Sequence, residues 1–190
     1  MQRLLGISGS LRKQSFNTAL LRAAAESCGS DATLDLATLH GIPLYDADEE
    51  AADGIPDPVQ ALKARVAACD GLLLVTPEYN NGIPGVFKNA IDWLSRPAAD
   101  IAQVFGDRPV AVIGASPGGF GTILSQNAWW PVLRTLRTNP WYGGRLMVSH
   151  AGSVFDDEGR LSDDKVRIQL QEFMAGFIRF VAAQQQEGAD

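Results

Sequence analysis

Three short segments of the chain carry residue types that suit an anionic or flat aromatic ligand. They are GSLRKQSFN at 9–17, PEYN at 77–80 and SPGGFG at 116–121. Each comes directly after an apolar run with the length and composition of a β-strand. Glycine, hydroxyl and amide residues in such turns let the backbone approach a ligand closely and donate hydrogen bonds to it. The sequence therefore predicts a binding site built mainly from loops.

The first segment has the composition of a phosphate-binding loop. It opens a predicted helix, whose free backbone N–H groups and dipole favour an anion. Ser10, Ser15 and Asn17 add hydrogen-bond donors, and Arg12 adds a guanidinium fork suited to phosphate oxygens. The alternative is that Ser15 or Asn17 caps the helix and that Arg12 is an ordinary surface arginine. The spacing matches neither G-x-G-x-x-G nor G-x-x-x-x-G-K-[ST], which disfavours a dinucleotide-binding Rossmann site and a nucleoside triphosphatase.

The second and third segments suit a flat heterocycle. Pro77, Glu78, Tyr79 and Asn80 precede a glycine-rich turn, in which backbone amides can lie against a ring while Tyr79 supplies aromatic surface. An ordinary turn is the alternative interpretation. Glu78 has no carboxylate or histidine nearby in the chain that would make it part of an acid–base pair. The glycines of 116–121 allow close backbone approach to a ligand, or simply form a flexible connection.

A regular alternation of predicted strands and helices positions these loops. Strands are expected at 3–8, 33–39, 71–76, 109–114 and 145–149, and helices at 86–94, 122–137 and 163–184 and from residues 16 and 57 onward. Residues 40–56 form a predicted loop, Asp57 caps the next helix, and Pro131 is expected to kink or interrupt its helix. Five strand–helix units imply a parallel sheet with helices on both faces. We predict one α/β domain over 1–190, doubly wound, with the flavodoxin-like strand order 2-1-3-4-5 and the three segments at its carboxyl edge.

Composition excludes several other classes of protein. A formal net charge of -6 and a pI near 4.9 argue against a broad nucleic-acid-binding face. Cys28 and Cys69 are too few for an iron–sulfur cluster held by four thiolates and are expected to be buried, and His40 and His150 lack the partners of a zinc site, so no metal is expected. The apolar start of the chain is too short for a signal peptide, and no run approaches the roughly 20 apolar residues of a membrane span. We expect a cytoplasmic protein without nucleic-acid or membrane partners.

The motifs GSLRKQSFN, PEYNNGIPGVFKNAIDWLSRP and GASPGGFG resemble those of the NADPH-dependent FMN reductase family, which includes quinone, chromate and azo-dye reductases. The resemblance covers nearly the whole chain. It implies a flavodoxin-like fold, bound FMN, NADPH or NADH as the electron donor, and a homodimer or a homotetramer formed as a dimer of dimers. It also implies a ping-pong reaction in which FMN takes a hydride from the nicotinamide and passes electrons to a small acceptor.

The resemblance also assigns residues to the parts of FMN. The phosphate and ribityl chain would be bound by Ser10, Arg12, Ser15, Phe16 and Asn17. The isoalloxazine ring would be edged by Pro77, Glu78, Tyr79 and Asn80, and the pocket completed by Ser116, Gly118 and Gly119. No side chain is assigned as acid, base or nucleophile, because the cofactor carries the chemistry.

The chain departs from the family pattern at Asn81 and Gly82, and at Asn127–Pro131 in the helix after the third segment. These positions lie near the expected acceptor pocket or subunit contacts, so quinones, azo compounds, chromate and free flavin all remain as acceptors. Two other functions remain as alternatives. One is a non-enzymatic electron carrier of flavodoxin type, whose phosphate loop lacks the arginine seen here. The other is a regulatory flavin-binding protein.

Two groups of aromatic and apolar residues have more than one interpretation. Trp129 and Trp130 follow the third segment and either stack on an acceptor or nicotinamide, or pack in the core or at a subunit contact. The helix at 86–94 carries more apolar residues than a sheet requires, which with the family resemblance predicts a homodimer. The alternative is a core helix in a monomer. The residues concerned are Val86, Ala90, Trp93 and Leu94.

Overall fold

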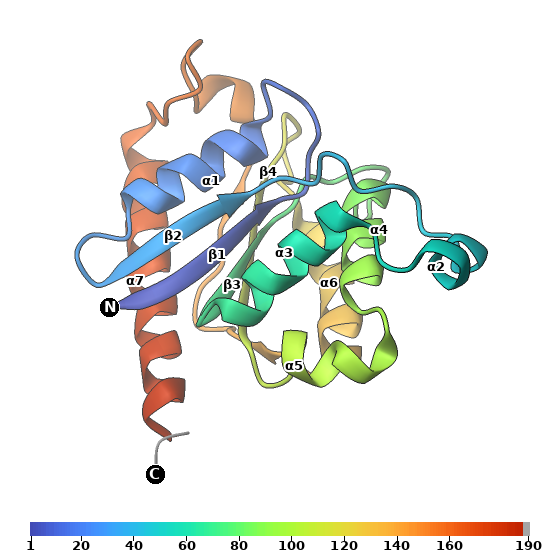
Figure 1. Cartoon of the computed structure of the whole chain (residues 1–190). Helices are drawn as coiled ribbons and strands as arrows, with labels where there is room; N and C mark the ends of the chain where they lie inside the picture. The colour runs from blue at the N-terminus through green and yellow to red at the C-terminus, as the bar shows by residue number, and fades with distance from the viewer. Residues whose placement is uncertain (188–190) are drawn as a thin grey trace.

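The strands form a parallel sheet in the order β2-β1-β3-β4-β5, as predicted (Figure 1). They are β1 (Gln2–Ser8), β2 (Ala32–Ala37), β3 (Gly71–Val75), β4 (Pro109–Ala115) and β5 (Asn139–Pro140), with β6 (Met147–Val148) also paired to β4. This computed structural model describes residues 1–187, so the end of the predicted domain 1–190 lies outside the described residues. Every residue of β3 and β4 is buried, because helices cover both faces of the sheet.

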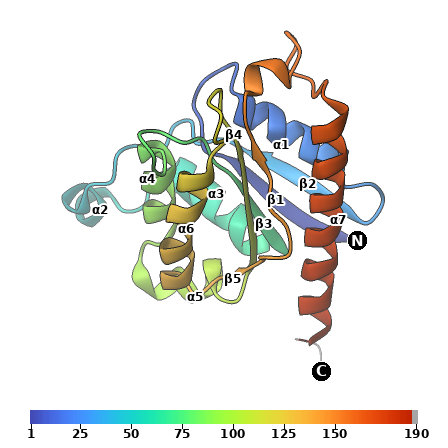
Figure 2. The same ribbon diagram turned by 180° about the vertical axis from the view of Figure 1, so that it is seen from behind.

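The helices divide between the two faces of the sheet (Figures 1 and 2). One face is covered by α1 (Phe16–Glu26) and α7 (Asp164–Glu187). The other is covered by α3 (Asp57–Ala68), α4 (Gly85–Leu94), α5 (Ile101–Phe105) and α6 (Ile123–Thr135). Each face has its own apolar core. In α7 the predicted inward stripe is buried at Leu170, Phe173, Phe177 and Val181, and only half-buried at Val166.

The last strand differs from the prediction, because it is split. β5 pairs with the beginning of β4 and β6 with its end, whereas one strand at 145–149 was expected. The chain leaves the sheet between them because the Trp141 indole turns inward against Phe173 (ring centroids 4.9 Å apart). A Cβ on Gly144 or Gly176 would lie 2.8 Å from that indole, so glycines line its pocket.

The segment 40–56, expected to be a loop, contains the short helix α2 (Ala47–Asp53). α2 lies apart from the sheet in both ribbon views. It is tied to the body through Glu50, which forms an ion pair with Arg96 (2.9 Å) and accepts a hydrogen bond from the Tyr45 hydroxyl (2.9 Å). Neither α5 nor the 3-10 turn at Ala98–Asp100 was predicted from the sequence.

Two helix details also differ from expectation. α3 begins at Asp57 itself, with Pro56 as its N-cap and no side-chain cap hydrogen bond. α6 runs through Pro131 without interruption. Pro131 is exposed, so its ring faces solvent and the loss is confined to one main-chain hydrogen bond. Among residues 1–187, no helix has the length and apolar character needed to cross a bilayer.

Candidate functional site

Three loops follow neighbouring strands at the carboxyl edge of the sheet. We call them the β1 loop (residues 9–15), the β3 loop (residues 76–84) and the β4 loop (residues 116–122). All three lie along the upper side of the view in Figure 1. Every predicted site residue lies in one of these loops or at the beginning of α1. Parallel strands end at the same edge, so the fold places the three predicted segments together.

Gly9 is where the β1 and β3 loops touch. Its N–H donates to the carbonyl of Val75 (2.9 Å). A Cβ at this position would lie 2.1 Å from the ring of Phe87 in α4 and 2.9 Å from Pro77. Only glycine fits such a contact, and the sequence alone did not indicate Phe87 as a support of the site.

Two serines shape the β1 loop. The Ser15 hydroxyl caps α1 by accepting from the backbone N–H groups of Asn17 (3.2 Å) and Thr18 (3.3 Å). The buried Ser10 hydroxyl accepts from the N–H of Arg12 (3.2 Å). Capping was the alternative interpretation for Ser15, and the structure bears it out. The hydroxyl keeps its own hydrogen, however, and can still donate to a ligand.

The β1 loop leaves several cationic and N–H groups unpaired. Within residues 1–187, the backbone N–H groups of Lys13, Gln14 and Phe16 have no acceptor, and Arg12 has no carboxylate partner. The exposed Arg12 guanidinium instead lies over the Phe16 ring, 5.6 Å from its centroid. Free amides at a helix N-terminus beside a free guanidinium form a suitable cradle for a phosphate.

Asn17 has a different role from the other predicted phosphate ligands. Its amide Nδ2 donates to the carbonyl of Ala115 (2.9 Å), and its Oδ1 accepts from the Ala115 N–H (2.9 Å). The side chain is buried and both of its polar atoms are occupied. The amide therefore ties the start of α1 to the end of β4 and fixes the β1 and β4 loops relative to each other. Direct contact between this amide and FMN stays a prediction.

The β3 loop is a rigid turn. Tyr79 and Gly82 exchange two backbone hydrogen bonds (3.2 and 3.1 Å), and the two residues between them, Asn80 and Asn81, have φ of 49° and 62°. Positive φ at both central positions defines a type I′ turn, and asparagine tolerates that region better than other side chains. Asn81, a departure from the family pattern, thus fits the turn. The Tyr79 side chain is 51% exposed and presents its ring at the site.

Glu78 connects the β3 loop to α6. Its Oε2 accepts from the backbone N–H groups of Leu124 (2.9 Å) and Ser125 (3.0 Å). Thr122, the N-cap residue of α6, forms no side-chain hydrogen bond to the N–H groups of the helix, so Glu78 caps this helix from another loop. Below it, the Thr76 and Ser125 hydroxyls are 2.8 Å apart. The carboxylate therefore has a positioning role, which the sequence did not reveal.

The β4 loop is closed by Ser116 and left open at its tip. The Ser116 hydroxyl donates to the carbonyl of Gly121 (2.6 Å), which has φ of 61°. Gly118 and Gly119 are exposed, and within residues 1–187 their N–H groups have no acceptor. The segment after β6 braces the loop, since the His150 N–H donates to the carbonyl of Gly118 (3.1 Å).

A family model described as NADPH-dependent FMN reductase matches residues 2–153, which include all three loops. The chain belongs to this family. That membership confirms the predicted NAD(P)H-dependent oxidoreductase with FMN as cofactor, rather than a non-enzymatic carrier of flavodoxin type.

Individual members of the FMN reductase family align along most of the chain. An NAD(P)H-dependent FMN reductase of Pseudomonas aeruginosa is 43% identical over 170 residues, covering 90% of each chain. A 2-hydroxy-1,4-benzoquinone reductase of a Burkholderia species is 38% identical over 175 residues, covering 92% of this chain and 93% of that one. The structure of FerB, an NAD(P)H:acceptor oxidoreductase from Paracoccus denitrificans, superposes with a TM-score of 0.85 at 30% identity, covering 96% of this chain and 98% of FerB.

The loops of this FMN reductase fit its cofactor chemically. FMN joins a phosphate dianion to a flat ring edged with hydrogen-bond acceptors. Among the described residues, the β1 loop offers unpaired N–H groups and Arg12, the β3 loop an exposed aromatic ring, and the β4 loop unpaired glycine N–H groups. His40, another residue whose contact the sequence did not indicate, pairs its Nε2 with the carbonyl of Leu11 (3.2 Å) and so supports the β1 loop from behind.

The two tryptophans after the β4 loop have different environments. Trp129 is fully buried and packs edge-on against Phe87, with ring centroids 4.9 Å apart. Core packing, one of its two predicted alternatives, is therefore its role. Trp130 is half-buried and packs against the exposed Tyr142 at 5.0 Å, at the rim of a cavity. Only Trp130 has surface left for an acceptor or a partner.

The apolar residues of α4, from which a dimer was predicted, are mostly buried within a single chain. Ala90, Trp93 and Leu94 are buried within this one chain, and only Val86 is half-exposed. Residues 43–45, just before α2, cover part of α4: the Trp93 indole N–H donates to the Pro43 carbonyl (3.0 Å), and the Tyr45 ring packs edge-on against Trp93 (ring centroids 4.9 Å apart). The apolar face of α4 is therefore used in the monomer.

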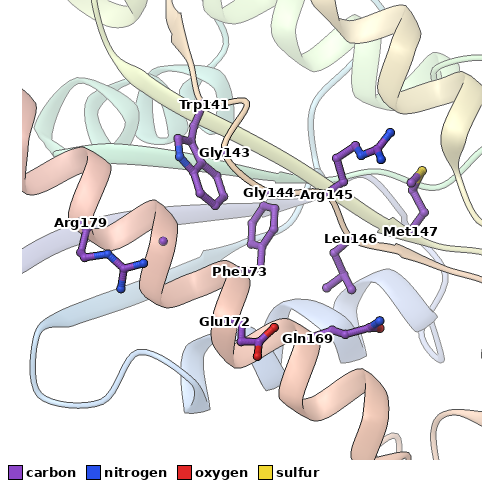
Figure 3. A pocket seen from close by; sticks show the side chains of 11 residues that line it. Trp141, Gly143, Gly144, Arg145, Leu146, Met147, Gln169, Glu172, Phe173 and Arg179 are labelled. Carbon is purple, nitrogen blue, oxygen red and sulfur yellow. The ribbon is translucent and has the colours of Figure 1, made fainter.

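A large cavity lies away from the three loops. Its volume is about 530 Å3, and it opens between residues 141–147 and α7 (Figure 3). The side chains of Trp141 and Phe173 line its apolar part, and Glu172 and Arg179 line its polar part. Its lining shares no residue with the loops, so the sheet edge and not this cavity is the candidate site.

Proposed function

We propose that the protein is an NAD(P)H:quinone reductase whose FMN is held by the β1, β3 and β4 loops. The observation that carries the proposal is the pairing of a rigid, internally bonded β3 loop with a β1 loop in which several N–H groups and Arg12 have no partner among residues 1–187. Quinones are favoured over azo compounds, chromate and free flavin because relatives named as quinone reductases align with more than nine tenths of this chain.

The proposed contacts follow the three parts of the cofactor. The phosphate and ribityl chain are held by Ser10, Arg12, Ser15 and Phe16, with Phe16 contributing its backbone N–H. Asn17 positions these residues by tying the start of α1 to Ala115. The ring is edged by Pro77, Glu78, Tyr79, Asn80, Ser116, Gly118 and Gly119. Bound FMN supplies the two-electron chemistry. The protein binds and orients the reactants, and no acidic or basic side chain is required to act as a proton donor.

Steady-state kinetics with a panel of acceptors test the acceptor class. The purified holoenzyme is assayed with NADPH and with NADH against benzoquinones, azo dyes, chromate and free FMN. We expect the highest kcat/KM with a quinone. A higher kcat/KM with free FMN or chromate, or no oxidation of either nucleotide, contradicts the proposal.

Rapid mixing separates a reductase from a regulatory flavin-binding protein. Under anaerobic conditions, NADPH alone should bleach the oxidised flavin absorbance completely within the time of one catalytic turnover. Bleaching over minutes, far slower than any quinone turnover, would argue for a protein whose reaction with NADPH is incidental.

We also propose that the protein is a homodimer. The support is a cavity of about 380 Å3 beside the β4 loop, whose apolar wall includes Ile123, Leu124, Trp130 and Tyr142. Three of these side chains are exposed, and burying such a patch favours association. Light scattering at micromolar concentration should give a mass above the 20.4 kDa of one chain. A mass of about four chains in the same measurement would indicate a homotetramer, the second assembly that we propose.

Two further proposals concern the chain as a whole. We propose that 1–190 is one domain, since the apolar core on one face of the sheet joins residues from Leu4 to Val181 and the core on the other face packs on the same strands. We also propose that the protein is cytoplasmic. Cys28 and Cys69 are both buried free thiols, which suits a reducing compartment. Limited proteolysis and cell fractionation test the two statements.

A further inference from the structure

A second cleft lies beside the β1 loop, on the side of the sheet that carries α1. Its volume is about 530 Å3. One wall is formed by the β1 loop and the first half of α1, and the other by the turn at 155–159. Phe16, Ala19 and Arg22 face it because residues three apart on a helix share a face. The cleft is continuous with the loop that we assign to the FMN phosphate.

The α1 wall of the cleft carries three cations. Arg12, Lys13 and Arg22 all line it, and none of them forms an ion pair with a carboxylate of the described residues 1–187. The chain as a whole has a net charge of -6, so three unpaired cations around one cleft are a local feature. Arg12 and the free N–H groups of the β1 loop suffice for one phosphate. Lys13 and Arg22 remain for a second anionic group.

The opposite wall is acidic, yet it does not neutralise these cations. Asp156 accepts from the backbone N–H groups of Arg160 (2.8 Å) and Glu158 (3.1 Å) and from the Arg160 guanidinium (2.8 Å). These bonds, the Arg160 N–H foremost, hold the pKa of Asp156 below its usual value. Glu158 is also paired with Arg160 (3.1 Å). Of the three carboxylates in this turn, only Asp157 has no hydrogen bond or ion pair with the described residues.

The end of the cleft next to the β1 loop is aromatic. The rings of Phe16 and Phe155 are stacked, with centroids 6.0 Å apart and planes 20° from parallel. Both residues line the cleft, with Phe155 only 7% exposed and the Arg12 guanidinium lying over the Phe16 ring. The cleft therefore combines two spare cations with a small aromatic margin. These groups suit a nucleotide with an additional phosphate, since the cations pair with phosphate oxygens and the aromatic margin packs beside a flat base.

We propose that this cleft binds the adenosine end of NADPH, with Lys13 and Arg22 contacting its 2′-phosphate. The inference rests on the proposed function and deepens it, because it assigns a preference for NADPH over NADH to named side chains. Arg12 stays with the FMN phosphate, so the two anions have separate cations. A basic side chain at the 2′ position discriminates in the same way in other nucleotide-binding proteins.

Direct binding tests the site without turnover. The FMN-loaded protein is titrated by calorimetry with adenosine 2′,5′-bisphosphate and, separately, with 5′-AMP. We expect the bisphosphate to bind more tightly, and Arg22→Ala and Lys13→Ala each to weaken it by about tenfold or more. Binding of 5′-AMP should change little. Arg134→Ala, which removes an exposed arginine of α6 outside the cleft, is the matched control and should leave both affinities unchanged.

Kinetics then separate the 2′-phosphate from the groups that NADPH and NADH share. In Arg22→Ala the kcat/KM for NADPH should fall by about tenfold, with that for NADH unchanged. Equal losses for both nucleotides would overturn the assignment, since they would mean contact with the pyrophosphate or with FMN. Equal affinity of the wild-type protein for the two titrants would overturn it too. Failure of the proposed function has a different signature: no quinone-dependent oxidation of either nucleotide by the wild-type enzyme.

Discussion

The β1 and β3 loops touch at Gly9 but are held in opposite ways. The β3 loop has its hydrogen bonds within the protein: the backbones of Tyr79 and Gly82 bond to each other, and the Glu78 carboxylate accepts from α6. The β1 loop leaves N–H groups and cations unpaired among the described residues. Binding of the flat flavin ring is favoured by a protein surface that is already ordered. The FMN phosphate, in contrast, can itself accept the hydrogen bonds that the N–H groups of the β1 loop do not make within the protein. We therefore expect the β3 loop to be ordered without FMN and the β1 loop to gain most from it.

Removing the support that both loops share should have the largest effect. Phe87→Ala deletes the ring that lies against Gly9 and Trp129, and the cavity left behind should lower the free energy of unfolding by about 3–5 kcal/mol. Urea denaturation of the apoprotein measures this loss. Phe120→Ala is the matched control, because that ring is 85% exposed, and it should change stability by less than about 0.5 kcal/mol. Similar losses in the two variants would show that Phe87 supports neither loop.

Asn17→Ala should separate a positioning role from a ligand role. It leaves the buried N–H and carbonyl of Ala115 unpaired, so the apoprotein should lose about 2–4 kcal/mol of unfolding free energy. Asn127→Ala, at an exposed amide of α6, should cost almost nothing. Unchanged apoprotein stability together with weaker FMN binding would reverse the assignment and make the Asn17 amide a direct ligand.

Arg12→Ala should show the reverse pattern, which sharpens the contrast between the loops. Loss of a charge-assisted contact should weaken FMN binding by about 1.5–3 kcal/mol, or roughly 10- to 150-fold. Apoprotein stability should stay nearly constant, because Arg12 is exposed and has no ion-pair partner among the described residues. Quenching of FMN fluorescence measures the affinity. An affinity equal to that of the wild type would remove Arg12 from the phosphate site.

Glu78→Gln should have the smallest effect. The amide keeps an oxygen for the N–H groups of Leu124 and Ser125 but loses the charge that favours a helix N-terminus. We expect a loss of about 0.3–1 kcal/mol in the free energy of unfolding. Glu172→Gln, at an exposed position in the middle of α7 away from either helix end, is the control and should be neutral. A large loss of FMN affinity at unchanged stability would mean that the carboxylate binds the cofactor.

Local patterns in the sequence were enough for most of the fold. The apolar runs at 71–75 and 109–115 formed the buried central strands, and the three ligand segments reached one edge because parallel strands end together. The last strand was mispredicted because its continuity depends on where the Trp141 indole packs. The helix at 47–53 was missed because it is short and exposed, and its anchor Arg96 lies 46 residues from Glu50.

The sequence by itself determined which residue types surround the site, because the turns and helix starts that carry them are local. Tertiary structure alone decided their roles. Asn17 meets Ala115 across 98 residues of sequence, and Glu78 meets α6 across 46, and no pattern in the chain indicates such pairs. Only folding brings such donors and acceptors within hydrogen-bond distance, so only the structure separates residues that hold the loops from residues that are free to bind.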